Sequence, residues 1–287
     1  MAQYQPRAKR IRPPAQVSQQ EMDYAKQISE KYIAPIFTGK EDFEIFSSLR
    51  FDSKMYNGPV SDLETIASSG NSLPKECFFL VDHHYARLKL SLEYFNWGFD
   101  LSQEVLLQKL SAAVSPLDLK NAYKLRILIS PVGSVKIETY PVAPVDDLWD
   151  GLLPDEDYKS PVYDIYLDPE PVVVSPFTSL KTTKRDHYTS ARERCLPGKT
   201  PFEDVFLHNT AGQMTESSFC NCAFWVDGNW QTPPLSSGTL IGTVRRQLLQ
   251  SKDLVENHVL YKDVKPGQKV LIMNAVIGVK KGVVRAA

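Results

Sequence analysis

A proline-rich, acidic stretch in the middle of the chain limits most strongly how this sequence can fold. Residues 141–161 contain four prolines and six acidic side chains, whereas the segments on either side are patterned as strands and helices. Proline lacks an amide hydrogen and fixes φ, so neither a helix nor a central strand can run through this stretch. We expect an exposed linker here, which divides the 287 residues into folded parts at 41–155 and 156–287. Residues 1–40 would form a tail and an N-terminal helix.

Charge and hydropathy exclude several classes of protein. The 33 basic and 34 acidic residues give a net charge of −1, whereas a dedicated nucleic-acid-binding domain is usually strongly basic. No apolar run approaches the roughly 18 residues that a membrane span needs. We therefore expect neither nucleic acid nor a membrane as a partner.

The four cysteines give no sign of a metal site. No two of them form a C-x-x-C pair, and only one histidine follows the last cysteine, so the ligand spacing of a zinc site is missing. No apolar secretory segment follows Met1. We expect free thiols in a reducing compartment, and hence a cytoplasmic protein with no bound metal.

Hydrophobic periodicity predicts the elements of the first half. A helix capped by Asp82 and ended by Gly98 carries an apolar stripe at helical spacing, and Arg87 lies off that stripe. The pair His83-His84 does not indicate a metal site, because adjacent helix positions do not share a face, and we expect His83 at the surface. The other expected elements are a helix from Ser18, a strand over 43–51, a loop over 57–72, a helix over 102–114, and a hairpin of strands 125–130 and 135–140.

Shorter elements follow the linker. We expect strands over 172–174, 204–208 and 216–226, a helix over 182–195, a turn over 209–212, a tight turn at Asp227-Gly228, and a helix that starts at Thr243.

Lys181 is the first residue with a chemical signature. It follows the apolar pair Pro176-Phe177 and stands where a helix is expected to begin. Partial burial and the positive end of a helix dipole both disfavour an ammonium ion, so they lower the pKa of a lysine and make its amine a usable nucleophile. Most lysines before a helix are solvated surface residues, so this feature alone is weak.

Glu216 heads a strand rich in apolar residues. A carboxylate at such a position is costly unless a cation pairs with it, and a protonated pyridine nitrogen would be such a cation. The alternative is a loop glutamate that faces water.

Small residues over 236–242 lead into the helix that starts at Thr243. The free amide groups of a helix start, the Thr243 hydroxyl and the helix dipole together suit a phosphate. The pattern is not GxxxxGK[ST], so a nucleoside triphosphate is not implied. The alternative is a turn with a threonine cap.

An amine nucleophile, a carboxylate and a phosphate-binding helix start meet the needs of one cofactor, pyridoxal phosphate. The lysine would hold its aldehyde carbon, the carboxylate would keep its ring nitrogen protonated, and the helix start would anchor its phosphate.

Three motifs resemble those of the class IV aminotransferase family, the fold-type IV pyridoxal phosphate enzymes. They are Lys-Thr-Thr-x-Arg-x-x-Tyr at 181–188, Thr-Glu-Ser-Ser-x-x-Asn at 215–221, and Thr-Pro-Pro-Leu-Ser-x-Gly-x-Leu-x-Gly-x-x-Arg at 232–245. Residues 43–50 and 82–88 resemble the family's Phe-Glu-x-x-Glu-Thr-Leu-Arg strand and Asp-x-His-x-x-Arg-Leu helix. The resemblance implies an α+β fold with a smaller N-terminal α/β domain and a larger C-terminal pseudo-barrel domain.

The resemblance also implies roles for single residues. Lys181 would bind the cofactor covalently and move protons, Glu216 would face the ring nitrogen, and Arg87 would hold the phosphate. The backbone of Ile241, Gly242 and Thr243 would share that phosphate. Ser48 stands where the family has the threonine of its Glu-Thr pair, so a hydroxyl survives there for proton transfer while the acid is lost.

Within the family the chain is most similar to the aminodeoxychorismate lyases, which form 4-aminobenzoate and pyruvate for folate synthesis. In that reading Arg126 would bind a substrate carboxylate, and Asn274 would match the asparagine of that group's Asn-Ser pair; the alternative for Arg126 is an ordinary arginine at a strand edge. The alternative functions are an aminotransferase for branched-chain or D-amino acids and a catalytically silent relative. The resemblance further implies a homodimer and a functional link to aminodeoxychorismate synthase.

Overall fold

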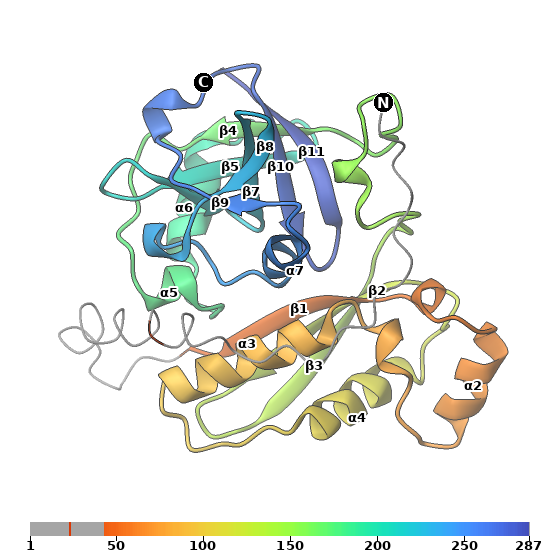
Figure 1. The fold of residues 1–287 in the computed structure, drawn as a ribbon. Helices are drawn as coiled ribbons and strands as arrows, with labels where there is room; N and C mark the ends of the chain where they lie inside the picture. The colour runs from red at the N-terminus through yellow and green to blue at the C-terminus, as the bar shows by residue number, and fades with distance from the viewer. Residues whose placement is uncertain (1–22, 24–42, 287) are drawn as a thin grey trace.

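Three antiparallel strands form a small sheet in the first half of the chain (Figure 1). The computed structural model describes residues 43–286 and the single residue Asp23, so the expected tail and the helix from Ser18 lie outside the described residues. Strands β1 (Ile45–Phe51), β2 (Tyr123–Ile129) and β3 (Val135–Pro141) pair in that order. Helices α3 (Val81–Tyr94) and α4 (Gln103–Val114) lie against this sheet and bury a common apolar core with it.

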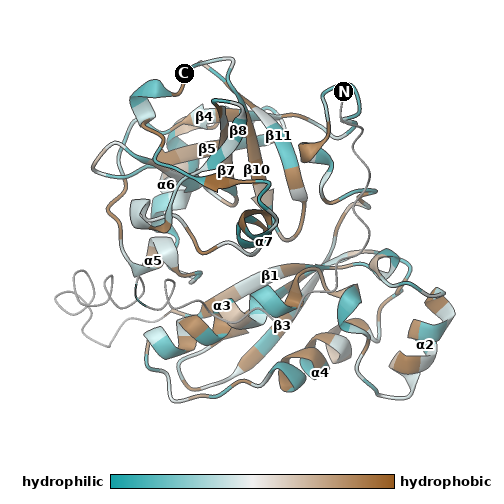
Figure 2. Ribbon diagram, viewed as in Figure 1, coloured by the Kyte–Doolittle hydropathy of each residue, from teal (hydrophilic) through white to brown (hydrophobic). Residues whose placement is uncertain are grey.

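Eight strands form a larger, curled sheet in the second half. Their order is β6-β5-β4-β11-β10-β7-β8-β9. They span β4 (Tyr163–Leu167), β5 (Glu203–His208), β6 (Met214–Ser217), β7 (Asn221–Val226), β8 (Asn229–Thr232), β9 (Val255–Glu256), β10 (Lys269–Asn274) and β11 (Gly278–Val284). The middle strands β7 and β10 are mostly apolar (Figure 2), and four of the six side chains in each are buried. The predicted α+β fold, with a small sheet and a larger curled one, is confirmed.

Helices and short 3₁₀ turns complete the described chain. The helices are α2 (Val60–Ser68), α5 (Pro176–Ser179), α6 (Asp186–Cys195) and α7 (Thr243–Ser251), and the 3₁₀ turns are η2 (Ser53–Met55), η3 (Lys75–Cys77), η4 (Asp150–Leu152), η5 (Leu235–Ser237) and η6 (Tyr261–Asp263). Within residues 43–286 no helix is both long and apolar enough to cross a bilayer.

Strand β1 joins the two sheets into one unit. On one edge it pairs with β2, and on the other the amide of Phe46 donates to the carbonyl of Lys181 at 2.9 Å. Further along, the amide of Arg50 donates to the carbonyl of Ala275 at 2.8 Å. Because both partners belong to the second half of the chain, β1 holds the segment around Lys181 and the β10–β11 turn against the small sheet.

Several sequence expectations are wrong in the structure. The loop expected over 57–72 contains helix α2, whose Leu63 is fully buried. The strand expected over 216–226 is two strands, because Ser217 donates its amide to the carbonyl of Cys220 and the chain turns there. The strand expected over 172–174 is reduced to a single bridge at Val172, and β4 at 163–167 was not predicted.

Two other expectations fail close to the candidate site. The helix expected from residue 182 begins only at Asp186, because residues 181–183 are held in bridge contact with β1. The stretch 141–161 is not exposed throughout: Lys280 on β11 forms a buried ion pair with Asp150 at 2.7 Å. His83, expected at the surface, is buried, and its Nε2 lies 3.1 Å from Oε1 of Gln247 on α7.

Candidate active site

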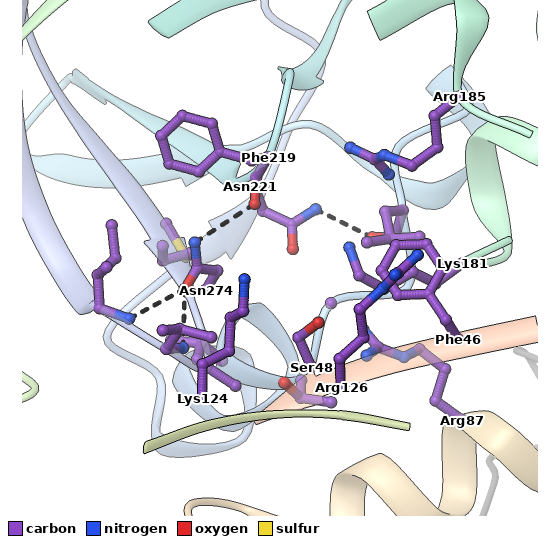
Figure 3. A pocket seen from close by; sticks show the side chains of 18 residues that line it. Phe46, Ser48, Arg87, Lys124, Arg126, Lys181, Arg185, Phe219, Asn221 and Asn274 are labelled. Carbon is purple, nitrogen blue, oxygen red and sulfur yellow. Dashed lines mark hydrogen bonds between the residues drawn. The ribbon is translucent and has the colours of Figure 1, made fainter. Parts of the chain in front are cut away.

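A cavity of about 470 Å³ lies where β1 and β2 meet the second half of the chain (Figure 3). Its wall also includes the segment after Lys181, the start of α7 and the β10–β11 turn. Five of its lining side chains are basic, and none of the described residues lining it is acidic: the basic residues are Arg87, Lys124, Arg126, Lys181 and Arg185. A cavity with this charge is suited to a ligand with several negative groups.

Lys181 presents its amine to this cavity. Its Nζ lies 4.8 Å from the centre of the Phe46 ring, on the strand that also binds the lysine's backbone. Burial, followed by the charges of Arg185 and Arg87, lowers the pKa of Lys181 well below its ordinary value. The sequence argument named partial burial and a helix dipole; the burial is present, but α6 begins five residues later, so like charge takes the place of the dipole. The amine is thus prepared to act as a nucleophile or a base.

Glu216 lies one layer behind the cavity wall. It is buried on β6, where it accepts hydrogen bonds from the Tyr188 hydroxyl, from the amide of Leu240 at 3.3 Å and from Asn221 Nδ2 at 3.3 Å. Burial raises the pKa of Glu216 to about 7, although the hydrogen bonds from Tyr188 and the Leu240 amide and the charges of Lys181 and Arg185 oppose the rise. Asn221, which is hydrogen-bonded to Glu216, lines the cavity, whereas Glu216 does not.

Arg87 and the start of α7 form a single group of donors, which we call the anion cup: Arg87, Gly242, Thr243 and Val244. The Arg87 side chain is buried and donates to the Ile241 carbonyl at 3.2 Å, and its Nε has no partner among the described residues. The first amides of α7 have no acceptor within the helix. The amide of Ile241, expected to join this group, instead donates to the Ser179 carbonyl at 3.1 Å.

The expected substrate residues also reach the cavity. Ser48 and Arg126 are opposite each other in the β1–β2 ladder, and both line the cavity. Arg126 donates to Glu138 at 3.1 Å. Asn274 lines the cavity, but its Oδ1 accepts the amides of Val276 and Ile277 at 2.8 and 3.0 Å, so it mainly shapes the β10–β11 turn.

Three polar lining residues were given no role by the sequence: Lys124, Arg185 and Asn221. Arg185 belongs to the Lys-Thr-Thr-x-Arg motif, and Asn221 is the last residue of the second motif. Neither motif indicates a role for these two residues. The structure places the Arg185 guanidinium 4.2 Å from the centre of the Tyr188 ring. Lys124 carried no signal beyond its strand, and only the pairing of β1 with β2 brings it to the cavity.

Solved structures share this fold and the arrangement of its two parts. A structure from Mesorhizobium loti superposes with a TM-score of 0.65 at 23% identity and covers 85% of this chain and 100% of its own. The 4-amino-4-deoxychorismate lyase of Pseudomonas aeruginosa superposes with a TM-score of 0.54 at 15% identity and covers 84% of this chain and 82% of its own. At these identities the likeness shows the fold alone.

Similarity in sequence, unlike the similarity in fold, shows to which family this chain belongs. The family described as amino-transferase class IV matches residues 63–281, so this chain belongs to the class IV aminotransferase family. Among its relatives, the aminodeoxychorismate lyase of Saccharomyces cerevisiae is 30% identical over 73% of this chain and 68% of the yeast protein. The resemblance inferred from the three motifs is confirmed.

Proposed function

We propose that this chain is a pyridoxal phosphate-dependent lyase that converts 4-amino-4-deoxychorismate into 4-aminobenzoate and pyruvate. The observation that carries the proposal is the cavity itself, in which a lysine of lowered pKa lies beside the anion cup and no described lining residue is acidic. The yeast relative, named for this reaction, supports the choice among the activities of the family.

The residues present fit the cofactor. The unpartnered Nε of buried Arg87 and the free amides of α7 suit a phosphate, which accepts hydrogen bonds at every oxygen. Gly242 lets Asn221 pack directly against this corner, because a Cβ there would lie 1.6 Å from Asn221 Oδ1. Lys181 would hold the aldehyde carbon, and Glu216 would be the acidic partner of the ring nitrogen, reached past Asn221.

Lys181 has the protonation state that the reaction needs. When bound, the cofactor supplies an electron sink for the carbon that carries the substrate amine. The neutral Lys181 amine would remove the proton from that carbon. The bond from the neighbouring ring carbon to the enolpyruvyl oxygen then breaks, and the ring becomes aromatic. The lysine ammonium or the Ser48 hydroxyl protonates the departing group, which becomes pyruvate.

The remaining cations suit the substrate's two carboxylates. Lys124 and Arg185 line the cavity and form no ion pair with a described residue, and Arg126 adds a forked donor on the β2 side. Bidentate carboxylate recognition is what an arginine provides best. These side chains would hold the ring while Lys181 acts on it.

The family resemblance supports a proposal for the oligomeric state and the cellular location. We propose a homodimer in the cytoplasm that works with an aminodeoxychorismate synthase in folate synthesis. The four cysteines, none of which is in a disulfide, agree with a reducing compartment.

A direct assay tests the activity. The holoprotein is mixed with 4-amino-4-deoxychorismate, and pyruvate and the fluorescence of 4-aminobenzoate are followed together. The proposal predicts equal amounts of both products without any amino acceptor, and loss of turnover in Lys181→Ala. The family name favours a second candidate, an aminotransferase, which would instead exchange amino groups with 2-oxoglutarate and release no pyruvate. A colourless protein inactive in both assays would indicate a silent relative.

A further inference from the structure

A chain of buried polar groups leads from Arg87 to Thr243 through two residues that have no assigned role. Arg87 Nη2 donates to Ser47 Oγ at 2.7 Å, and Ser47 Oγ lies 2.7 Å from His84 Nδ1. On its other side, His84 Nε2 lies 3.4 Å from Thr243 Oγ1. All four side chains are buried, and both ends of the chain belong to the anion cup.

The direction of the hydrogen bonds follows from the first donor. A guanidinium has no acceptor, so Ser47 Oγ must accept from Arg87. The hydroxyl proton of Ser47 then has one printed neighbour that can take it, His84 Nδ1. The opposite arrangement, with a proton on Nδ1, would leave the Ser47 proton buried without a partner, which costs free energy.

The imidazole is neutral in this position. It faces the charges of Arg87 and Lys181 and the ring of His83, and burial together with these neighbours lowers the pKa of His84 well below its ordinary value. A neutral imidazole that accepts at Nδ1 carries its single proton on Nε2. That proton points at Thr243 Oγ1, so the threonine oxygen accepts and its own proton is free to point elsewhere.

We propose that His84 is a positioning residue for the anion cup: fixed by Ser47 as the Nε2–H tautomer, it directs the Thr243 hydroxyl proton toward the cofactor's phosphate. This inference rests on the proposed function, because it concerns the group that the cup would bind. The anion cup then presents only hydrogen-bond donors, which suits a fully ionised phosphate. With the other tautomer, Thr243 would donate to His84 and offer the phosphate only a lone pair.

Nitrogen NMR on protein labelled with ¹⁵N-histidine reads the tautomer directly. The chain has five histidines, and the His84 signals are assigned as those missing from His84→Gln, or by elimination of the other four. We expect protonated Nε2 and unprotonated Nδ1 in the wild-type protein, and loss of this preference in Ser47→Ala. A proton on Nδ1 would overturn the inference.

Cofactor affinity gives a second readout. Asparagine at position 84 can imitate Nδ1 but not the Nε2 donor, whereas glutamine can imitate the Nε2 donor. We expect His84→Asn to raise the dissociation constant for pyridoxal phosphate by about tenfold or more, and His84→Gln to stay within about threefold of wild type. The control is His83→Gln, which changes the neighbouring buried ring without touching the chain of bonds.

The outcomes separate this inference from the proposed function. Equal loss of affinity in both His84 variants, or no loss in either, would contradict the positioning role while leaving a cofactor-binding wild type intact. A wild-type protein that binds no pyridoxal phosphate would contradict the proposed function. Even then, NMR of the His84 tautomer in the cofactor-free protein would still test the inferred directions of the hydrogen bonds.

Discussion

Gly242 and Asn221 are packed so closely that no side chain larger than hydrogen fits between them. A Cβ on Gly242 would lie 1.6 Å from Asn221 Oδ1. The same asparagine donates to Glu216 at 3.3 Å and to the Leu240 carbonyl at 3.0 Å. This contact therefore couples the anion cup to the carboxylate behind the cavity wall.

Replacement of Gly242 by alanine should disturb both sites together. Forcing an extra carbon into a packed site costs about 1–3 kcal/mol, and we expect a lower melting temperature and weaker binding of pyridoxal phosphate. Thermal unfolding and a cofactor titration measure the two effects. Gly98→Ala is the matched control, because nothing lies within 4 Å of its added carbon. Equal behaviour of the two variants would show that the cup tolerates the side chain.

Glu216 should make the stability of the cofactor-free protein depend on pH. Its pKa rises from 4.5 in a model peptide to about 7 in the fold, so the folded state holds a proton that the unfolded state has released. The stability that this proton provides is complete below pH 4.5 and is lost as the pH rises through about 7. Glutamine does not titrate, so the stability of Glu216→Gln does not fall over this interval. The free energy of unfolding of the variant minus that of the wild type should therefore increase with pH by up to about 3 kcal/mol.

Urea unfolding at a series of pH values measures the Glu216 effect. The matched control is Glu64→Gln, which changes an exposed carboxylate on α2. A difference between Glu216→Gln and wild type that stays constant from pH 4 to pH 8 would contradict the raised pKa.

Arg126 should act on substrate binding more than on the chemical step. It lines the cavity while paired with Glu138 at 3.1 Å, so its orientation is fixed before any ligand binds. If it holds a substrate carboxylate, Arg126→Gln should raise KM about tenfold or more and change kcat less. Lys136→Gln is the control, because Lys136 pairs with the same carboxylate at 2.8 Å outside the cavity. A fall in kcat alone would rule out this role.

Lys280 should be needed for stability although it lies away from the cavity. It pairs with Asp150 at 2.7 Å, both side chains are nearly inaccessible, and Ser160 Oγ lies 3.0 Å from its Nζ. Lys280→Met leaves a buried carboxylate unpaired and should cost about 3–5 kcal/mol. The double variant Asp150→Leu/Lys280→Met should recover most of this loss. Denaturant unfolding compares them, and a single variant as stable as wild type would contradict the assignment.

Local signals predicted elements wherever the chain's own neighbours decide its conformation. Ser102 was expected to start a helix, and its side chain accepts the amide of Val105 at 3.2 Å as the cap of α4. The missed helix α2 shows how the same signals mislead: Pro59 and Gly70 were taken as loop residues, but Pro59 directly precedes the helix and Gly70, with φ of 74°, follows its end.

The features that the sequence did not predict depend on contacts between residues that are far apart in the chain. Lys181 was found from sequence, but its burial, which is the main cause of its lowered pKa, and the nearby charge of Arg87 depend on how the two halves meet. Nothing local shows that β1 holds residues 181–183 out of a helix. The burial of His84 between Ser47 and Thr243 joins three elements, so no periodicity could have indicated it.

The covalent partner of the cofactor is the most direct test of this account. The protein is loaded with pyridoxal phosphate, reduced with borohydride and digested, and the peptide that carries the reduced cofactor is sequenced by mass spectrometry. We predict that the modification lies on Lys181, with none in Lys181→Ala. A modification on another lysine, or a wild-type protein that retains no reduced cofactor, would contradict it.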